Sequence, residues 1–392
     1  MNAAMAATPP RSRWDIFCRV VDNFGDAGVA WRLARLLAAE HDLDVTLWID
    51  GPAALARIAP GVAAGSAAQG MRGVTVRHWV EPFPDVDPPD VVVEAFGCGL
   101  PDAYAAAMAA GPAPPAWFVL EYLSAEAWVD GTHGLPSPHP RLPLVRRFWF
   151  PGFTERTGGL LRERDLFARR DAFLADRAAS AGLWEELRVP RPEPGEFAVS
   201  LFCYPNPALP ALFDAWADGD RPVVCVVPEG VAAGALDAWG AGAVPHPGGA
   251  PLARGRLRLH RIPFVDQDAY DRLLWACDVN FVRGEDSFVR AQWAARPFAW
   301  HIYPQAQNAH GAKLAAFLDR YTFGLDACAA VAVRRFMQAW NGNAAGAPVG
   351  AAWLDFLAAC PHLERHGSDW ATQLADLPEL AAGLVKAAAE GV

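Results

Sequence analysis

The fold is decided by the stretch Trp14-Asp-Ile-Phe-Cys-Arg-Val-Val-Asp-Asn-Phe-Gly-Asp-Ala-Gly28 and the segment from Val29 to Glu40 that follows it. The first eight residues form an apolar run of the length and composition of a buried strand, and the glycines after it indicate a turn. The segment 29–40 repeats apolar residues at helical spacing. A strand, a tight turn and a helix in this order are typical of the start of a parallel α/β sheet.

The same alternation continues along both halves of the chain. In the first half, further strands are predicted at 45–49, 74–80, 91–96 and 117–122. From about residue 151 onward, a helical segment is rich in Arg, Glu and Asp. This segment ends in Pro190-Arg-Pro-Glu-Pro194, which indicates a linker between two domains. A second series of strands is then predicted at 197–204, 222–227, 257–262, 279–282 and 298–302.

We therefore expect an α/β protein with two Rossmann-like domains that face each other across a cleft. The expected units are a disordered tail at 1–13, an N-terminal Rossmann-like domain at 14–190, a C-terminal Rossmann-like domain at 196–370, and a C-terminal helix at 371–392 that packs back on the first domain. This is the architecture of GT-B glycosyltransferases and of some sugar-nucleotide epimerases. The fold alone does not choose among them.

Composition narrows the class of protein. The 392 residues include 34 Lys and Arg against 44 Asp and Glu, a net charge of −10. This balance argues against binding to nucleic acid or to anionic membranes, which requires basic patches. The seven cysteines are scattered without a CxxC pair, and no apolar stretch is long enough to cross a bilayer. We expect a reduced, cytoplasmic protein.

The first chemical motif is the acidic pair Asp22 and Asp26, at the end of the first predicted strand. Two carboxylates four positions apart around a glycine turn can both point into the mouth of a cleft. The alternative is a turn with a helix N-cap, because Asp and Asn are favoured there. The acidic pair is expected to lie opposite a second motif at the end of another strand, and this position favours a chemical role over a helix cap.

That second motif is Val282-Arg-Gly-Glu-Asp-Ser-Phe-Val-Arg290, where another predicted strand meets a helix. A helix N-terminus suits a diphosphate. Ser287 offers an oxygen contact there, and Arg283 can neutralise phosphate charge. Glu285 or Asp286 can accept hydrogen bonds from sugar hydroxyls. A capped helix with surface salt bridges is the alternative.

Aromatic and amide side chains also lie at strand ends of the second half. Phe202 and Tyr204 end one predicted strand, and Phe264 and Gln267 follow another. They can stack on a pyrimidine base and recognise it, although single aromatic residues more often belong to a core.

The sequence patterns that could bind a metal are weak: two Asp-x-Asp strings lie in predicted turns, and the pair His362 and His366 lacks a third ligand. We expect no metal and no cofactor.

Two motifs in this order carry a resemblance. Trp14 to Gly28 and the run Arg283-Gly-Glu-Asp-Ser-Phe-Val-Arg-Ala-Gln-Trp293 resemble the elongation factor P arginine rhamnosyltransferase family, with Leu201-Phe-Cys-Tyr204 between them. The resemblance covers nearly the whole chain after the N-terminal tail. It implies an inverting GT-B enzyme that moves L-rhamnose from dTDP-β-L-rhamnose onto one arginine of elongation factor P. In that family, the modification lets the factor rescue ribosomes stalled on polyproline.

The resemblance also implies residue roles. Asp26 is expected to be the general base, and Asp22 is expected to hold the acceptor guanidinium. The expected donor site consists of Phe202, Tyr204, Phe264, Gln267, Glu285, Asp286 and Ser287, to which we add Arg283 for its charge. Two alternatives stay open: another sugar-nucleotide enzyme, such as a small-molecule glycosyltransferase or an epimerase, and a non-catalytic regulator that binds a nucleotide and a protein partner.

Overall fold

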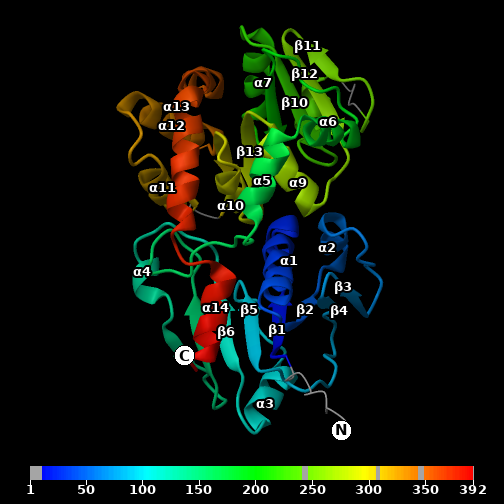
Figure 1. Ribbon diagram of the computed structural model, residues 1–392, viewed down its shortest axis with the longest axis vertical. Coiled ribbons are helices and arrows are strands. Elements are labelled where there is room, and N and C mark those ends of the chain that lie inside the picture. Colours follow the sequence, from blue (N-terminus) through cyan, green and yellow to red (C-terminus); the bar gives the residue numbers. More distant parts are fainter. Residues whose placement is uncertain (1–10, 241–245, 306–309, 343–347, 392) are drawn as a thin grey trace, which may run out of the picture.

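The computed structural model describes residues 11–240, 246–305, 310–342 and 348–391, which form two α/β domains stacked end to end (Figure 1). The N-terminal domain is built on an eight-stranded sheet of order β3-β4-β2-β1-β5-β6-β8-β7. Its strands are β1 (Arg13–Cys18), β2 (Asp44–Ile49), β3 (Ala68–Met71), β4 (Val74–His78), β5 (Val91–Ala95), β6 (Ala116–Leu120), β7 (Pro136–Pro138) and β8 (Val145–Trp149). Its helices are α1 (Asn23–Glu40), α2 (Pro52–Ile58), α3 (Asp102–Ala110) and α4 (Val129–Thr132).

The C-terminal domain is built on a six-stranded sheet of order β11-β12-β10-β9-β13-β14. Its strands are β9 (Phe197–Leu201), β10 (Val223–Pro228), β11 (Leu252–Arg254), β12 (Leu257–Ile262), β13 (Val279–Arg283) and β14 (Phe298–His301). The remaining helices are α5 (Leu166–Ala175), α6 (Arg177–Glu186), α7 (Leu209–Asp218), α8 (Ala233–Trp239), α9 (Gln267–Ala276), α10 (Asp286–Ala294), α11 (His310–Tyr321), α12 (Ala327–Trp340), α13 (Val349–Ala375) and α14 (Leu380–Ala389).

Each predicted strand corresponds to an observed strand, and these ten strands pair in parallel. Four further strands were not predicted. Three of them, β3, β7 and β11, are short antiparallel edge strands without an apolar run. The fourth, β8, carries two arginines in its five residues, and only its last residue is buried. Its pattern does not resemble that of a central strand.

The first helix begins earlier than its apolar spacing suggests. We expected the helix at Val29, but α1 begins at Asn23, so that Asp22 is its N-cap residue and Asp26 lies in its first turn. The Asp26 carboxylate accepts the backbone N–H groups of Val21 and Asp22, both at 2.8 Å. The acidic motif is therefore the beginning of a helix rather than a separate turn.

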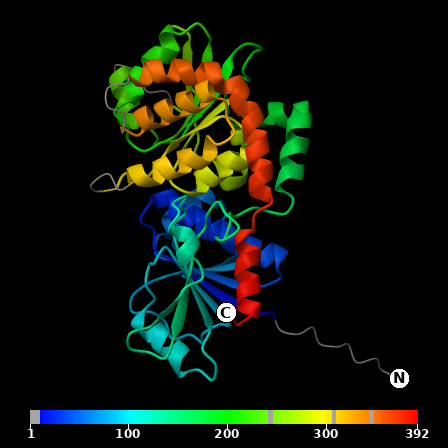
Figure 2. The same cartoon turned by 90° about the vertical axis from the view of Figure 1, so that its left-hand side faces the viewer.

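Two boundaries differ from the sequence-based division of the chain. The apolar side chains of α5 and α6, placed before residue 190 in the expected first domain, belong to the core of the second sheet. Similarly, α13 continues past residue 370 to Ala375. The final helix α14 returns to the first domain, where Leu380, Ala381, Leu384 and Ala387 join the core around β1 and β2 (Figure 2). Local composition cannot show which sheet a helix packs against.

The chain passes between the domains twice, and the two passages touch. The N–H of Leu380 donates to the carbonyl of Leu160 at 3.2 Å. Next to this contact, Gly159 has φ +70°, and a Cβ there would lie 1.7 Å from the carbonyl oxygen of Pro378. Only glycine allows the two backbones to approach this closely.

A buried ionic cluster joins the two domains. Arg32 of α1 is 2% exposed; its Nε donates to Asp286 at 2.7 Å, and its Nη2 donates to Asp271 at 3.0 Å. Arg290 of α10 binds the same Asp271 at 2.6 Å and Glu163 at 2.7 Å. Burial by itself would lower the pKa of Arg32, but the three carboxylates outweigh it and raise that pKa. Because Arg32 and its partners Asp271 and Asp286 come from different domains, the cluster fixes α1 against α9 and α10.

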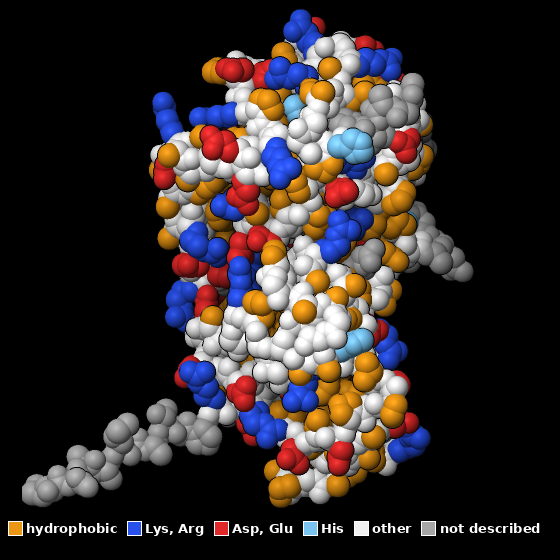
Figure 3. Space-filling view, turned by 90° about the vertical axis from the view of Figure 1, so that its right-hand side faces the viewer, with side chains coloured by type: hydrophobic (Ala, Val, Ile, Leu, Met, Phe, Trp, Pro, Cys, Tyr) orange, Lys and Arg blue, Asp and Glu red, His pale blue; other side chains and the backbone are white. Residues whose placement is uncertain are grey.

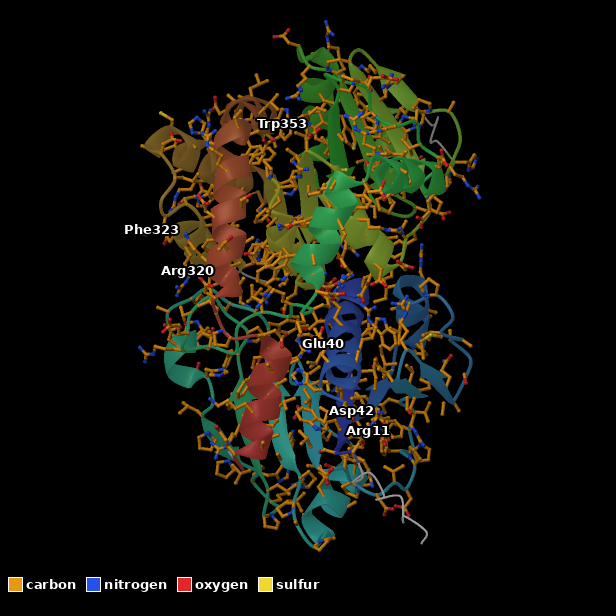
Figure 4. All side chains as sticks on the ribbon, in the orientation of Figure 1. Arg11, Glu40, Asp42, Arg320, Phe323 and Trp353 are labelled. Atoms are coloured by element: carbon orange, nitrogen blue, oxygen red, sulfur yellow. The ribbon has the colours of Figure 1, made fainter. Side chains whose placement is uncertain are left out.

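Weaker bridges surround this cluster. Asp268 of α9 binds Arg35 at 3.2 Å and Arg72 at 2.6 Å, and acidic and basic side chains gather at this level of the surface (Figure 3). On α11, the Nε of Arg320 donates to the carbonyl of Ala125 at 2.9 Å (Figure 4). These contacts are partly exposed, so each stabilises the interface less than the buried cluster does.

Replacing Arg32 by Gln should lower the free energy of unfolding by about 3–5 kcal/mol, because it leaves buried carboxylates without their cation. Urea denaturation measures the change. The matched control is Arg335→Gln, which removes an exposed arginine paired with Asp355 and should change stability little. Equal stabilities of the two variants would contradict the role assigned to the cluster.

Candidate functional site

The site forms where the ends of β1 and β13 face each other across the interface between the domains. The acidic turn leaves β1, and the second motif leaves β13 and enters α10. Between them, Gly284 has φ +61°, and a Cβ at this position would lie 2.6 Å from Oδ2 of Asp22 and 2.9 Å from the hydroxyl of Tyr204. The structure therefore brings the two motifs into contact through a glycine.

Both carboxylates of the acidic pair are held by neutral donors. Asp26 is 2% exposed, and besides its two backbone partners it accepts the hydroxyl of Tyr122 at 3.3 Å. Asp22 accepts the hydroxyl of Tyr204 at 2.5 Å. Burial raises the pKa of both carboxyls above the ordinary value, while these hydrogen bonds, together with the nearby charge of Arg283 in the case of Asp22, lower it. Ionised carboxylates in this setting favour a cationic ligand.

A third carboxylate joins the pair from the opposite domain. Glu285 accepts the backbone N–H of Leu123 at 3.0 Å. Burial raises the pKa of Glu285 to about 8; the Leu123 N–H and Lys313 lower it, and Asp26 raises it further. The sequence placed Glu285 with the donor-binding residues, whereas the structure places it beside Asp26.

These groups open onto what we call the acidic pocket, of about 870 Å³ including its open mouth. It is lined by Val21, Asp22, Gly25, Asp26, Tyr122, Leu123, Gly284, Glu285, Phe288, Trp300, Ile302, Tyr303, Gln305 and Lys313. Both domains contribute. Two carboxylates, the carboxyl group of Glu285, which keeps its proton up to about pH 8, and the apolar and aromatic walls suit a cationic side chain with an apolar stem.

A second cavity, the aromatic pocket, lies on the other side of Asp22 and Gly25, which line both. It measures about 530 Å³ including its mouth. It is lined by Asp22, Phe24, Gly25, Ile58, Phe202, Pro228, Phe264, Val265, Asp266, Gln267, Tyr270, Arg283, Asp286 and Ser287. Six of the eight expected donor-binding residues are therefore together here, and the two others, Tyr204 and Glu285, are not among its lining residues.

Arg283 is the cationic residue that lines the aromatic pocket. Its guanidinium lies 4.5 Å from the ring centre of Phe202, 4.6 Å from that of Tyr204 and 5.7 Å from that of Phe24. Its Nη1 donates to the carbonyl of Cys203 at 3.4 Å. Aromatic faces hold a guanidinium without neutralising it. The pocket therefore presents positive charge to an anion.

The polar residues around Arg283 are engaged with the protein and form the pocket wall. Gln267 donates from Nε2 to Asp286 and to the carbonyl of Gly28, both at 3.0 Å. The Ser287 hydroxyl donates to the carbonyl of Arg283 at 2.5 Å and accepts its N–H at 3.0 Å. Asp286 also binds Arg32, so the wall of the pocket and the ionic cluster share a carboxylate.

Sequence reasoning missed Tyr122, Leu123, Phe24 and Lys313. Tyr122 could have been found from the sequence, because it ends a predicted strand and ligands bind at the carboxyl ends of parallel strands. Phe24 lies inside the acidic motif and packs against Phe264 with 4.5 Å between ring centres. Lys313 follows no strand, and no pattern in the sequence pointed to it.

The metal-type patterns form no cluster. Among residues 11–240, 246–305, 310–342 and 348–391, no three His, Cys, Asp or Glu side chains are arranged to hold a metal. His362 pairs with Asp326 at 3.0 Å, and His366 contacts the carbonyl of Tyr321. Within the same described residues, no helix is both long and apolar enough to span a bilayer.

A family model, two sequence relatives and a solved structure all show similarity of this chain to the same family. The family described as "Elongation-Factor P (EF-P) rhamnosyltransferase EarP" matches residues 14–389. Proteins named protein-arginine rhamnosyltransferase from Pseudomonas putida and Pseudomonas aeruginosa are 49% and 47% identical to this chain, over 96% and 95% of it and 98% of each relative. A solved structure described as "Structural basis for EarP-mediated arginine glycosylation of translation elongation factor EF-P" has a TM-score of 0.70 at 35% identity and covers 97% of this chain and 100% of that one. The predicted GT-B fold is confirmed.

The variant Glu285→Gln should become more stable relative to the wild-type protein as the pH rises. The folded carboxyl has a pKa of about 8 against an ordinary 4.5, so the folded state binds this proton more tightly than the unfolded chain does. Wild-type protein therefore loses unfolding free energy between about pH 4.5 and pH 8, and Gln avoids this loss. Urea denaturation at pH 5 and pH 8 should show the gain of the variant growing with pH. The control Glu155→Gln, at an exposed position, should show no such growth.

Proposed function

The chain belongs to the elongation factor P rhamnosyltransferase family, and from this premise we propose that it moves L-rhamnose from dTDP-β-L-rhamnose onto an arginine side chain of elongation factor P. The modified factor then acts on ribosomes stalled on polyproline. The relatives named protein-arginine rhamnosyltransferase support the reaction. The donor nucleotide and the residue roles are part of the proposal, and they are supported by the resemblance and by the lining of the two pockets.

The observation that carries the proposal is the convergence of Asp22, Asp26 and Glu285 on one pocket. An arginine guanidinium has a pKa above 12 and a delocalised lone pair, so it is a poor nucleophile. Carboxylates can hold it through paired N–H···O bonds and so fix one nitrogen against the sugar. The cation also offsets the unfavourable burial of the carboxylates.

The donor fits the aromatic pocket. Phe202 and Phe264 offer faces for a pyrimidine ring, and Arg283 offers positive charge for a diphosphate. The N-terminus of α10 adds a partial positive charge at the pocket wall. Because Asp22 and Gly25 line both pockets, the anomeric carbon of a donor bound here would lie close to the acceptor carboxylates.

The proposed step is a single in-line displacement. The C–N bond forms as the bond between the anomeric carbon and the diphosphate oxygen breaks, and the electron pair leaves with the diphosphate. The sugar passes through an oxocarbenium-like state. As the C–N bond forms, the nitrogen becomes acidic and its proton moves to Asp26. Inversion at the anomeric carbon follows from one displacement, and Asp22 holds the guanidinium.

The direct test is intact-mass analysis of elongation factor P incubated with this protein and dTDP-β-L-rhamnose. We expect a gain of one deoxyhexose, located on arginine by peptide fragmentation. No gain at saturating donor would contradict the proposal. Turnover of the donor without an acceptor would indicate an epimerase, and binding of the donor with no change in any acceptor would indicate a non-catalytic regulator.

The roles of the acidic pair are separated by matched variants. Asp26→Asn should lower kcat by about 10²- to 10⁴-fold, because the proton acceptor is lost, while the donor still binds. Asp22→Asn should mainly raise the KM for the acceptor. Calorimetric donor binding with steady-state transfer measures both. Strong residual transfer by Asp26→Asn, with Asp22→Asn inactive, would reverse the assignment.

A further inference from the structure

Two consecutive residues after β6 contact the carboxylates of both domains. The hydroxyl of Tyr122 donates to Oδ1 of Asp26 at 3.3 Å, and the next backbone N–H, of Leu123, donates to Glu285 at 3.0 Å. Asp26 lies on α1 and Glu285 immediately precedes α10. Residues 122–123 therefore lie between the two acids, at the wall of the acidic pocket.

The ring of Tyr122 contacts an aromatic ring and a cation. It stacks on Phe96 with 4.5 Å between ring centres and 19° between the ring planes, and the ammonium of Lys313 lies 5.9 Å from its centre. Phe96 has φ +58°, a left-handed backbone conformation that is unfavourable for a phenylalanine. Its N–H donates to the carbonyl of Leu120 at 2.6 Å, which holds this conformation. The surrounding structure thus places the stacking ring despite the strain.

The Tyr122 hydroxyl is the donor in its contact with Asp26. Burial raises the pKa of this phenol, and the nearby charges of Asp26 and Glu285 raise it further. The phenol therefore keeps its proton wherever the carboxylates are ionised. It cannot compete with Asp26 for the acceptor proton, but it can stabilise and orient the ionised form of Asp26.

We propose that Tyr122 is a positioning residue for the transfer reaction, whose hydroxyl orients the Asp26 carboxylate toward the acceptor. This proposal rests on the proposed function, in which Asp26 takes the proton. The two backbone N–H bonds engage Oδ2 of Asp26, so that Tyr122 fixes the other oxygen, Oδ1. Without it, the carboxylate keeps its position on the helix but loses the donor on its second oxygen.

The charged and titratable groups that face Asp26 come from several elements. They are Cys18 on β1, Asp22 beside it, Asp50 after β2, Tyr122 after β6 and Glu285 before α10. Among the described residues, Tyr122 is the side chain that donates to Oδ1 of Asp26, so its removal leaves this oxygen without a side-chain donor. Removing the hydroxyl should therefore raise the pKa of Asp26 still further.

Tyr122→Phe tests the proposal because it removes one oxygen and keeps the stacking ring. A base must be ionised to act, so the rate rises with pH through the pKa of Asp26. The variant should shift this acidic limb upward by about one pH unit, since one hydrogen bond to a charged group has an energy of this order. On the limb, kcat should fall about tenfold, and the difference should shrink at higher pH. Donor affinity, measured by calorimetry, should not change.

The matched control is Tyr321→Phe, which removes a buried hydroxyl from a tyrosine that lines neither pocket and should leave the profile unchanged. An unshifted acidic limb in Tyr122→Phe would overturn the proposal, as would a loss explained by weaker donor binding. These outcomes differ from failure of the proposed function, in which wild-type protein transfers no sugar at any pH.

Discussion

Arg32 is an arginine removed almost completely from water, and its neutralisation constrains the rest of the molecule. Its partners Asp271 and Asp286 belong to the C-terminal domain, while Arg32 belongs to the helix that begins with the acidic turn. Satisfying this one cation therefore fixes α1 against α9 and α10. Because Asp286 also lines the aromatic pocket, the same contact sets the distance between the two halves of the site.

The site and the cluster use carboxylates in opposite ways. In the cluster, Asp271 receives two guanidinium groups and its charge is compensated within the protein. In the acidic pocket, Asp22 and Asp26 are bonded to tyrosine hydroxyls and backbone N–H groups, which orient a carboxylate without cancelling its charge. Burial then raises their pKa values. A cationic ligand removes that penalty, so in the proposed reaction the binding of the acceptor and the activation of Asp26 would depend on the same desolvation.

The central strands could be predicted because both of their faces are buried, which requires continuous apolar runs such as those of β1 and β5. The edge strands escaped prediction because pairing on one side needs no such run. The start of α1 at Asn23 was missed because a side chain, Asp26, caps the backbone that precedes it. Assignment of α5, α6 and α14 to their sheets depends on contacts across long sequence separations, and local spacing contains no information about these.

The sequence by itself determined the two motifs, Asp22 to Asp26 and Arg283 to Ser287, and their positions at strand ends, because parallel sheets direct their carboxyl ends to one edge. Tertiary structure decided which pocket each residue serves: it placed Glu285 beside Asp26, bonded Tyr204 to Asp22, and engaged Gln267 and Ser287 in the pocket wall. Tertiary structure also brought Tyr122 into contact with Asp26 and Arg32 into contact with Asp271 and Asp286. The physical reason is that the environment of a carboxylate, its burial and its donors, is built from segments that meet only in the folded chain.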